Sequence, residues 1–335
     1  MRVIARTSAR TVPIIASLAI GAFALCSQRA TADEGGVSFW LPGTYGSLSV
    51  VPGEPGWSFV TFNYYDSVSA GKSVDFERGG GIVAGVNARI DLQYFYPTYT
   101  FATPVLGGQA SLGMGALIGG NDTSVSGTLT GPGGRTISGS RSDSIFGIGD
   151  LYPTATLKWN QGVHNFMTYL TGDIPVGAYD SNRLASLGIG HGAIDGGGGY
   201  TYFDPQSGHE FSTVMGLTYN FINPSTQYQN GVDAHLDWAA SQFLNEHVHV
   251  GAVGYFYDQL TGDSGSGAKL GPFESRVIGV GPQIGYLFPV AGMQGYVNLK
   301  GYEEFDARDR PSGWNVWLTI SISPAAPATP AAANN

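Results

Sequence analysis

Residues 313–323 show a pattern that recurs along most of the chain. Trp314, Leu318 and Ile320 share one face of this stretch, whereas Asn315 and Thr319 lie on the other. Alternation of apolar and polar residues is typical of a β-strand with one apolar and one polar face. The same period-2 pattern recurs upstream, for example at 232–243 and 247–258. The pattern therefore predicts an all-β chain.

Turn-rich segments separate these alternating stretches. We expect twelve strands, near 57–66, 82–96, 105–117, 145–159, 163–174, 194–203, 209–222, 232–243, 247–258, 275–288, 294–305 and 313–323. About 9–11 tilted residues are enough for a strand to cross a bilayer. Each of the expected strands is long enough to do so.

The links between the expected strands alternate between short and long. The short ones lie near 97–104, 160–162, 204–208, 244–246 and 289–293, and the long ones near 67–81, 118–144, 175–193, 223–231, 259–274 and 306–312. Outer-membrane barrels have short periplasmic turns and longer extracellular loops. The sequence thus predicts a transmembrane up-and-down antiparallel β-barrel of about twelve strands. Whether the 118–144 loop folds inward as a plug stays open.

The N-terminus has the three parts of a secretory signal. Arg2, Arg6 and Arg10 precede an apolar stretch at 12–25, and Ala30-Thr31-Ala32 follows. This arrangement predicts cleavage after Ala32, since the apolar core is too short for a membrane anchor. We expect a signal peptide at 1–32, the barrel at 33–323 and a disordered Pro/Ala-rich tail at 324–335.

Charge and cysteine content narrow the class of protein. Charged residues are 12% of the chain, about half of the ~25% usual for soluble domains. Without the four arginines of residues 1–32, 12 basic residues remain against 25 acidic ones, and the only Cys is lost as well. An acidic chain is a poor nucleic-acid binder. These features favour the bacterial outer membrane, with lipid, small solutes and the barrel-assembly machinery as partners.

Charged and histidine side chains recur on the face that we assign to the barrel interior. The expected lumen-lining residues are Arg89, Asp91, Asp150, Lys158, Asp173, Asp233, His235, Asp237, His247, His249, Lys300 and Glu304. Their acidic excess argues against a pore selective for anions.

Two kinds of chemistry compete with a simple polar wall. His247 and His249 with a carboxylate from 233–237 would suffice for a Zn or Fe site, but antiparallel neighbours bring such groups together inside any barrel. A hydrolase would need a pair such as Ser241 with His235, or Ser212 with His164, and no G-x-S-x-G motif singles out one Ser. We expect no catalytic residue, no metal and no cofactor. Gly196–Gly199 indicates a place where lumen contents approach the wall closely.

Several motifs resemble one bacterial family of outer-membrane proteins. They are Phe39-Trp40-Leu41-Pro42-Gly43, Pro97-Thr98-Tyr99, the stretch from Gly147 to Pro153, the stretch from Tyr169 to Gly177, Asp195 with Gly196–Gly199, Asn230-Gly231-Val232-Asp233, and Gly279 to Gln283. The chain is similar to the family named after the MetA pathway of phenol degradation. This resemblance implies an outer-membrane barrel that takes up aromatic or other hydrophobic compounds. It assigns no catalytic residues.

The function that we expect is passive movement of small, aromatic or hydrophobic compounds across the outer membrane. The alternative is a structural or adhesive barrel with a closed lumen and partner-binding loops. Fold alone does not decide between the two.

Overall fold

The computed structural model describes residues 38–71, 75–78, 81–130, 136–269 and 271–326. The expected signal peptide at 1–32 and most of the expected tail at 324–335 lie outside these ranges. Within them, no helix is long and apolar enough to cross a membrane.

Twelve antiparallel strands form one closed barrel, as the alternating pattern predicted. Consecutive strands pair with each other, and β1 closes the ring by pairing with β14 from Phe59↔Ile322 to Ser69↔Ser312. The barrel strands are β1 (Gly56–Ser69), β4 (Val86–Thr100), β5 (Gln109–Thr130), β6 (Thr136–Gln161), β7 (His164–Asp173), β8 (Ala193–Asp204), β9 (His209–Asn220), β10 (Asp233–Phe243), β11 (Val248–Gln259), β12 (Arg276–Val290), β13 (Met293–Arg308) and β14 (Ser312–Pro324).

The two ends of the barrel differ, because the longest links, such as 174–192 and 260–275, lie at one end. The expected long link at 306–312 is reduced there to residues 309–311. One end carries the short turns and both ends of the barrel sequence, Gly56 and Pro324; we call it the short-turn end. The opposite, long-loop end carries the remaining links. One of these contains a separate hairpin of β2 (Asp75–Arg78) and β3 (Gly81–Ala84).

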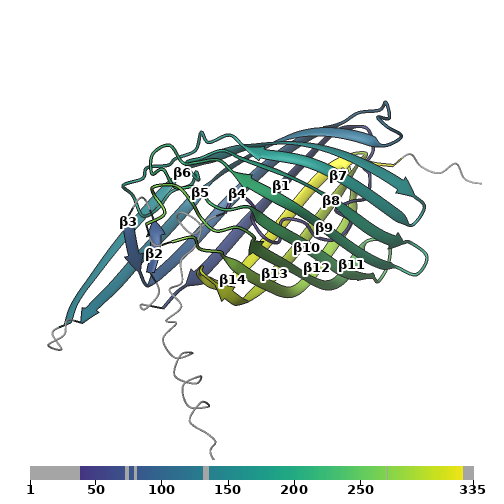
Figure 1. The fold of residues 1–335 in the computed structure, drawn as a ribbon. Helices are drawn as coiled ribbons and strands as arrows, with labels where there is room; N and C mark the ends of the chain where they lie inside the picture. Colours follow the sequence, from purple (N-terminus) through teal and green to yellow (C-terminus); the bar gives the residue numbers. More distant parts are fainter. Residues whose placement is uncertain (1–37, 72–74, 79–80, 131–135, 270, 327–335) are drawn as a thin grey trace, which may run out of the picture.

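The segment 118–144 does not fold into the lumen. Its described residues continue β5 and β6, whose pairing extends to Thr130↔Thr136. The resulting hairpin projects well beyond the barrel at the left of Figure 1. The possibility that this segment is a plug is therefore excluded for the described residues.

The outer face of the barrel is largely apolar. Leu170 on β7, Leu217 on β9 and Ile284 on β12 are 57%, 53% and 50% exposed. Burying one such side chain is worth about 1.5–3 kcal/mol, and monomeric soluble proteins rarely expose large contiguous apolar patches. The outer wall is thus suited to contact with lipid.

Candidate functional site

The lumen contains the segment that precedes the first strand. Residues 38–55, which we call the plug, contact side chains that project inward from strands around the barrel. Ser38 lies toward the long-loop end, Gly43 beside β10 and β13, and Val50 beside β8. The chain then enters β1 at the short-turn end. The plug therefore runs down the length of the lumen.

The middle of the plug is held by its backbone. The Asp237 carboxylate on β10 accepts hydrogen bonds from the backbone N–H groups of Gly43, at 2.8 Å, and Tyr45, at 3.0 Å. The Lys300 ammonium on β13 donates to the carbonyls of Gly43, Thr44 and Tyr45. Asp237 and Lys300 thus satisfy polar backbone groups that would otherwise be buried without partners, which costs about 1–3 kcal/mol each.

A second pair of charged side chains holds the part of the plug nearer the short-turn end. Glu210 on β9 accepts hydrogen bonds from Ser47 Oγ at 2.7 Å and from Leu48 N–H at 3.0 Å. Lys158 on β6 donates to the carbonyls of Ser49, at 2.8 Å, and Val51, at 3.3 Å. Acids of the wall therefore bind plug amides, and lysines bind plug carbonyls.

Ser47 also joins a side-chain network with the wall. Its Oγ lies 2.8 Å from Ser241 Oγ, and Gln283 Nε2 donates to both hydroxyl oxygens at 2.8 and 2.9 Å. The network crosses from the plug to β10 and β12. It fixes the register of the plug against the wall.

An aromatic stack anchors the part of the plug nearer the long-loop end. The Trp40 ring lies parallel to the His235 ring, with centroids 3.6 Å apart and planes 13° apart. His235 Nε2 lies 2.8 Å from Asp195 Oδ2 and 3.3 Å from the Tyr169 hydroxyl. The carboxylate and the hydroxyl therefore orient the imidazole on which Trp40 rests.

Glycine replaces a larger side chain in the wall beside Val50 of the plug. A Cβ at Gly199 on β8 would lie 2.7 Å from Val50 Cγ2. Val50 is fully buried. The glycine run at 196–199 thus includes a position that leaves room for a plug side chain, in line with the close approach expected there.

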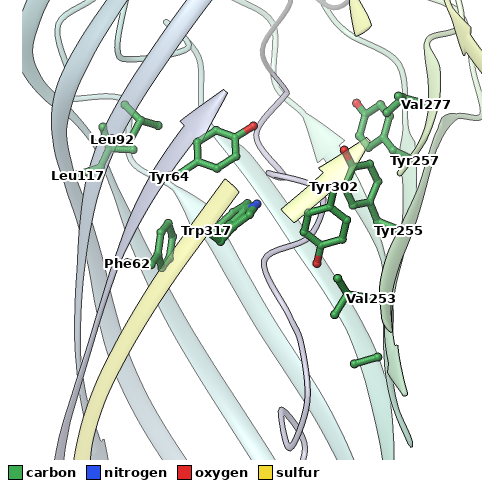
Figure 2. Packing of buried hydrophobic residues seen from close by; sticks show 11 residues of the cluster. Phe62, Tyr64, Leu92, Leu117, Val253, Tyr255, Tyr257, Val277, Tyr302 and Trp317 are labelled. Atoms are coloured by element: carbon green, nitrogen blue, oxygen red, sulfur yellow. The ribbon is translucent and has the colours of Figure 1, made fainter. Parts of the chain in front are cut away.

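The lumen also contains an aromatic and apolar cluster. Phe62 and Tyr64 on β1, Leu92 on β4 and Trp317 on β14 form one buried cluster with Tyr255 and Tyr302, and Leu41 of the plug packs against it. Figure 2 shows Tyr64 and Trp317 facing Tyr255 and Tyr302, with the purple coil of the plug between them.

A pocket of about 850 Å³, including its open mouth, lies at the long-loop end. Leu41 and Pro42 of the plug line it, together with strand residues such as Tyr64 and Ile90.

The loop at 174–192 supplies another side of the pocket through Ser186 and Leu187. The Asp150 carboxylate on β6 accepts N–H groups of Gly177 at 2.7 Å and Ile189 at 2.8 Å, which tie this loop to the barrel. On the loop itself, the backbone N–H and side chain of Asn182 donate to Asp180 and lower the pKa of its carboxyl. Backbone hydrogen bonds therefore shape the loop.

Most of the expected lumen residues lie on the inner face. Their side chains are buried or contact the plug or the pocket: Asp150, Lys158, Asp173, Asp233, His235, Asp237, His249, Lys300 and Glu304. His247 is exposed at the short-turn end, where its ring contacts the Leu287 carbonyl.

Arg89 and Asp91 correct the expected assignment. Both are exposed on the outer face of β4, and Asn63 donates to Asp91 there. Near Arg89 and Asp91 the apolar side chains of Ile90 and Leu92 point inward instead and belong to or pack against the buried cluster. The outward apolar residues of β4, such as Phe95 and Tyr99, lie in its short-turn half.

The metal and hydrolase alternatives gain no support from these positions. His249 stacks with Tyr296, away from the contact between His235 and Asp195. Within the described ranges, no group of three or more His, Cys, Asp or Glu residues is arranged to hold a metal ion. Ser241 bonds to Ser47 and Gln283, and Ser212 bonds to Glu210 and Thr201.

Neither composition nor alternation revealed the plug. The segment at 38–55 has no strand period, and it binds the wall mainly through its own backbone atoms, so its side chains carry no recognisable binding pattern. The Phe39–Gly43 motif marked the segment only through the family resemblance.

Comparisons with known proteins agree with the fold. The COG4313 outer membrane channel from Pseudomonas putida F1 is similar over 84% of this chain and 99% of that one, with 13% identity and a TM-score of 0.61. A FadL homologue of Pseudomonas aeruginosa gives 11% identity, 88% and 97% coverage and a TM-score of 0.38. The translocator domain of the autotransporter NalP from Neisseria meningitidis gives 11% identity, 83% and 91% coverage and 0.39.

The first of these likenesses shows a shared barrel fold, and the other two are too weak to carry an argument. No curated protein matches the chain. The model of the family described as "Putative MetA-pathway of phenol degradation" matches residues 71–320. This chain belongs to that family.

Proposed function

We propose that the chain is an outer-membrane channel for the passive uptake of small hydrophobic or aromatic compounds. The observation that carries the proposal is the largely apolar pocket at the long-loop end, which is lined in part by a plug that hydrogen bonds hold against the wall. A solute can leave water for this pocket without any energy source. The proposal that the solutes are aromatic rests on the description of the family.

The proposed location is the bacterial outer membrane. The apolar outer face supports contact with lipid, and the expected signal peptide at 1–32 supports export. The likeness to an outer-membrane channel supports the fold that such a location needs. The long-loop end would then face outward, as in other outer-membrane barrels.

The proposed mechanism has three steps. A solute enters the pocket between Tyr64, Ile90 and Leu187. The plug then moves away from Asp237 and Lys300, because its contacts otherwise fill the lumen below the pocket. Release follows into the periplasm. None of these steps needs ATP, a metal or a redox cofactor.

Uptake into liposomes tests the proposal directly. Purified barrel in liposomes is expected to admit a small hydrophobic solute faster than protein-free liposomes, down its gradient. A deletion strain is expected to grow more slowly on limiting aromatic carbon sources. No uptake in liposomes, together with normal growth of the deletion strain, would contradict the proposal.

The filled lumen favours one alternative, a structural or adhesive barrel that stays closed. Under that alternative, the plug contacts at Asp237, Glu210 and Lys158 are permanent. Planar bilayers then show no opening in the wild type. The channel proposal predicts openings.

A further inference from the structure

The pocket at the long-loop end has an apolar body and one polar side. Val68, Val86, Ala88, Ile90 and Leu92 from β1 and β4 line the apolar part. The charged side consists of Asp66 on β1 with Glu304 and Arg310 on β13 and in the link that follows, beside Asn315 on β14; the polar residues Ser38, Asn121 and Ser186 complete the lining. A ligand that fills the pocket therefore meets hydrocarbon over most of its surface and charge at one place.

Asp66 lines this pocket with a carboxylate that is almost entirely buried. It faces inward between Ile90 and Asn315 in the register of the barrel, and only 8% of its surface is exposed. In the part of the chain that the structure describes, its Oδ1 has no hydrogen-bond partner. A buried acceptor without a partner costs free energy, which a ligand with a donor would recover.

The other carboxylate of the pocket is already occupied. Glu304 Oε1 accepts the Tyr255 hydroxyl at 2.9 Å, and its Oε2 accepts Gly313 N–H at 2.9 Å. The acceptor left for a ligand is therefore the one on Asp66.

The charge balance around the acceptor is negative. Arg310 lies 4.0 Å from Glu304 Oε1, and its guanidinium carbon lies 5.4 Å from the centre of the Tyr257 ring. One arginine thus faces two carboxylates, Asp66 and Glu304. A ligand carboxylate would be repelled by this excess, whereas an amine would be attracted.

We propose that the pocket binds small molecules with an apolar body and one hydrogen-bond donor, a hydroxyl or a protonated amine, placed against Asp66, and that it rejects carboxylates. This inference rests on the proposed function, because it names the solutes that the channel would admit. Tyr64 and Tyr255 add aromatic faces on which a cationic donor is stabilised.

Binding to four probes of similar size tests the inference. We would titrate ethylbenzene, benzyl alcohol, benzylamine and benzoate calorimetrically into the purified full chain in detergent. Benzylamine and benzyl alcohol are expected to bind more tightly than ethylbenzene, and benzylamine at least about tenfold more tightly than benzoate. Benzoate that binds as tightly as benzylamine would overturn the inference.

A matched pair of variants locates the effect. Asp66→Asn removes the charge at nearly constant shape and is expected to weaken benzylamine binding at least about fivefold, with ethylbenzene little changed. Asp91→Asn changes an exposed carboxylate on the outer face of the adjacent strand and should leave all four affinities unchanged. Equal effects of the two variants on benzylamine would overturn the assignment to Asp66.

Two further readouts keep the results interpretable. Heat-modifiable migration on gels shows whether Asp66→Asn folds, and the ranking of the four probes on the wild type tests the inference without any variant. Liposome uptake, measured separately, tests the proposed function. Selective binding without uptake contradicts the channel, whereas uptake with no preference for donors contradicts the pocket inference alone.

Discussion

The two sides of the lumen differ in what they offer to the plug. From β6 to β13 the wall presents charged side chains, including Lys158, Glu210, Asp237 and Lys300, that bind the plug backbone. From β14 through β1 to β4 it presents mainly aromatic and aliphatic side chains, such as Trp317 and Phe62, which form one cluster with Tyr255 and Tyr302 of β11 and β13 and pack against Leu41. One side fixes the plug, and the other leaves an apolar space beside it.

This division has a physical basis. A peptide without secondary structure has backbone N–H and C=O groups that need partners when they are buried. Charged side chains provide strong hydrogen bonds to such groups. An apolar wall provides no such hydrogen bonds. A hydrophobic solute that binds there therefore displaces water rather than the plug.

Removing the plug should have the largest effect. A chain that lacks residues 39–51 loses the contacts to Asp237, Glu210, Lys300 and Lys158. Its conductance in planar bilayers is expected to rise at least about tenfold, because water and ions fill the vacated lumen. Heat-modifiable migration checks that the barrel still folds. Unchanged conductance in a folded variant would show that the plug does not block the pore.

Breaking the polar side at one point should have a smaller effect. Asp237→Ala removes the acceptor of two plug amides, at Gly43 and Tyr45. We expect docking of the plug to weaken by about 3 kcal/mol and openings in planar bilayers to become more frequent. Asp91→Ala, on the outer face, is the control. If both variants open equally often, the polar side does not hold the plug.

Crowding the wall at Gly199 should have a smaller effect than the loss of Asp237. The Cβ of Gly199→Val would lie 2.7 Å from Val50 Cγ2 and 3.0 Å from the Thr213 carbonyl oxygen. Overpacking of this kind costs about 1–3 kcal/mol, so hydrogen exchange at residues 47–51 should accelerate. The matched control is Gly53→Ala, because a Cβ there meets nothing within 4 Å. Exchange that stays slow in Gly199→Val would contradict close packing.

Removing the aromatic stack should have the smallest effect. Trp40→Leu keeps an apolar side chain but loses the parallel contact with His235. The expected cost is about 1 kcal/mol, detectable as faster exchange at residues 40–45. Trp57→Leu changes an indole that is 66% exposed on the outer face, and exchange in the plug should not respond to it. A response of equal size to both variants would refute the stacking role.

The barrel was predictable from the sequence because its signals are local. Period-2 alternation and turn residues lie within each hairpin, so all twelve strands were located, with bounds shifted by a few residues in most cases. The 118–144 segment was misread as a loop, since its Ser, Thr and Gly residues look like a linker although most of them continue β5 and β6.

The functional interior was less predictable, for two reasons. Alternation defines two faces of a strand but not which face points inward, so Arg89 and Asp91 were assigned to the lumen although Ile90 and Leu92 line it. The plug contacts join residues as far apart as Gly43 and Lys300 through backbone carbonyls. No pattern of side chains records such a contact.

A reversible covalent lock on the plug tests the central claim most directly. Ser47 Oγ and Ser241 Oγ lie 2.8 Å apart, so the Ser47→Cys, Ser241→Cys double variant places two thiols side by side, and closure of the disulfide is checked by thiol titration. If solute passage requires the plug to move, the oxidised double variant should take up hydrophobic solute into liposomes at least about tenfold more slowly than the wild type, and reductant should restore uptake. Ser47→Cys alone should not respond to oxidation. Equal uptake with the bridge closed and open would contradict the account.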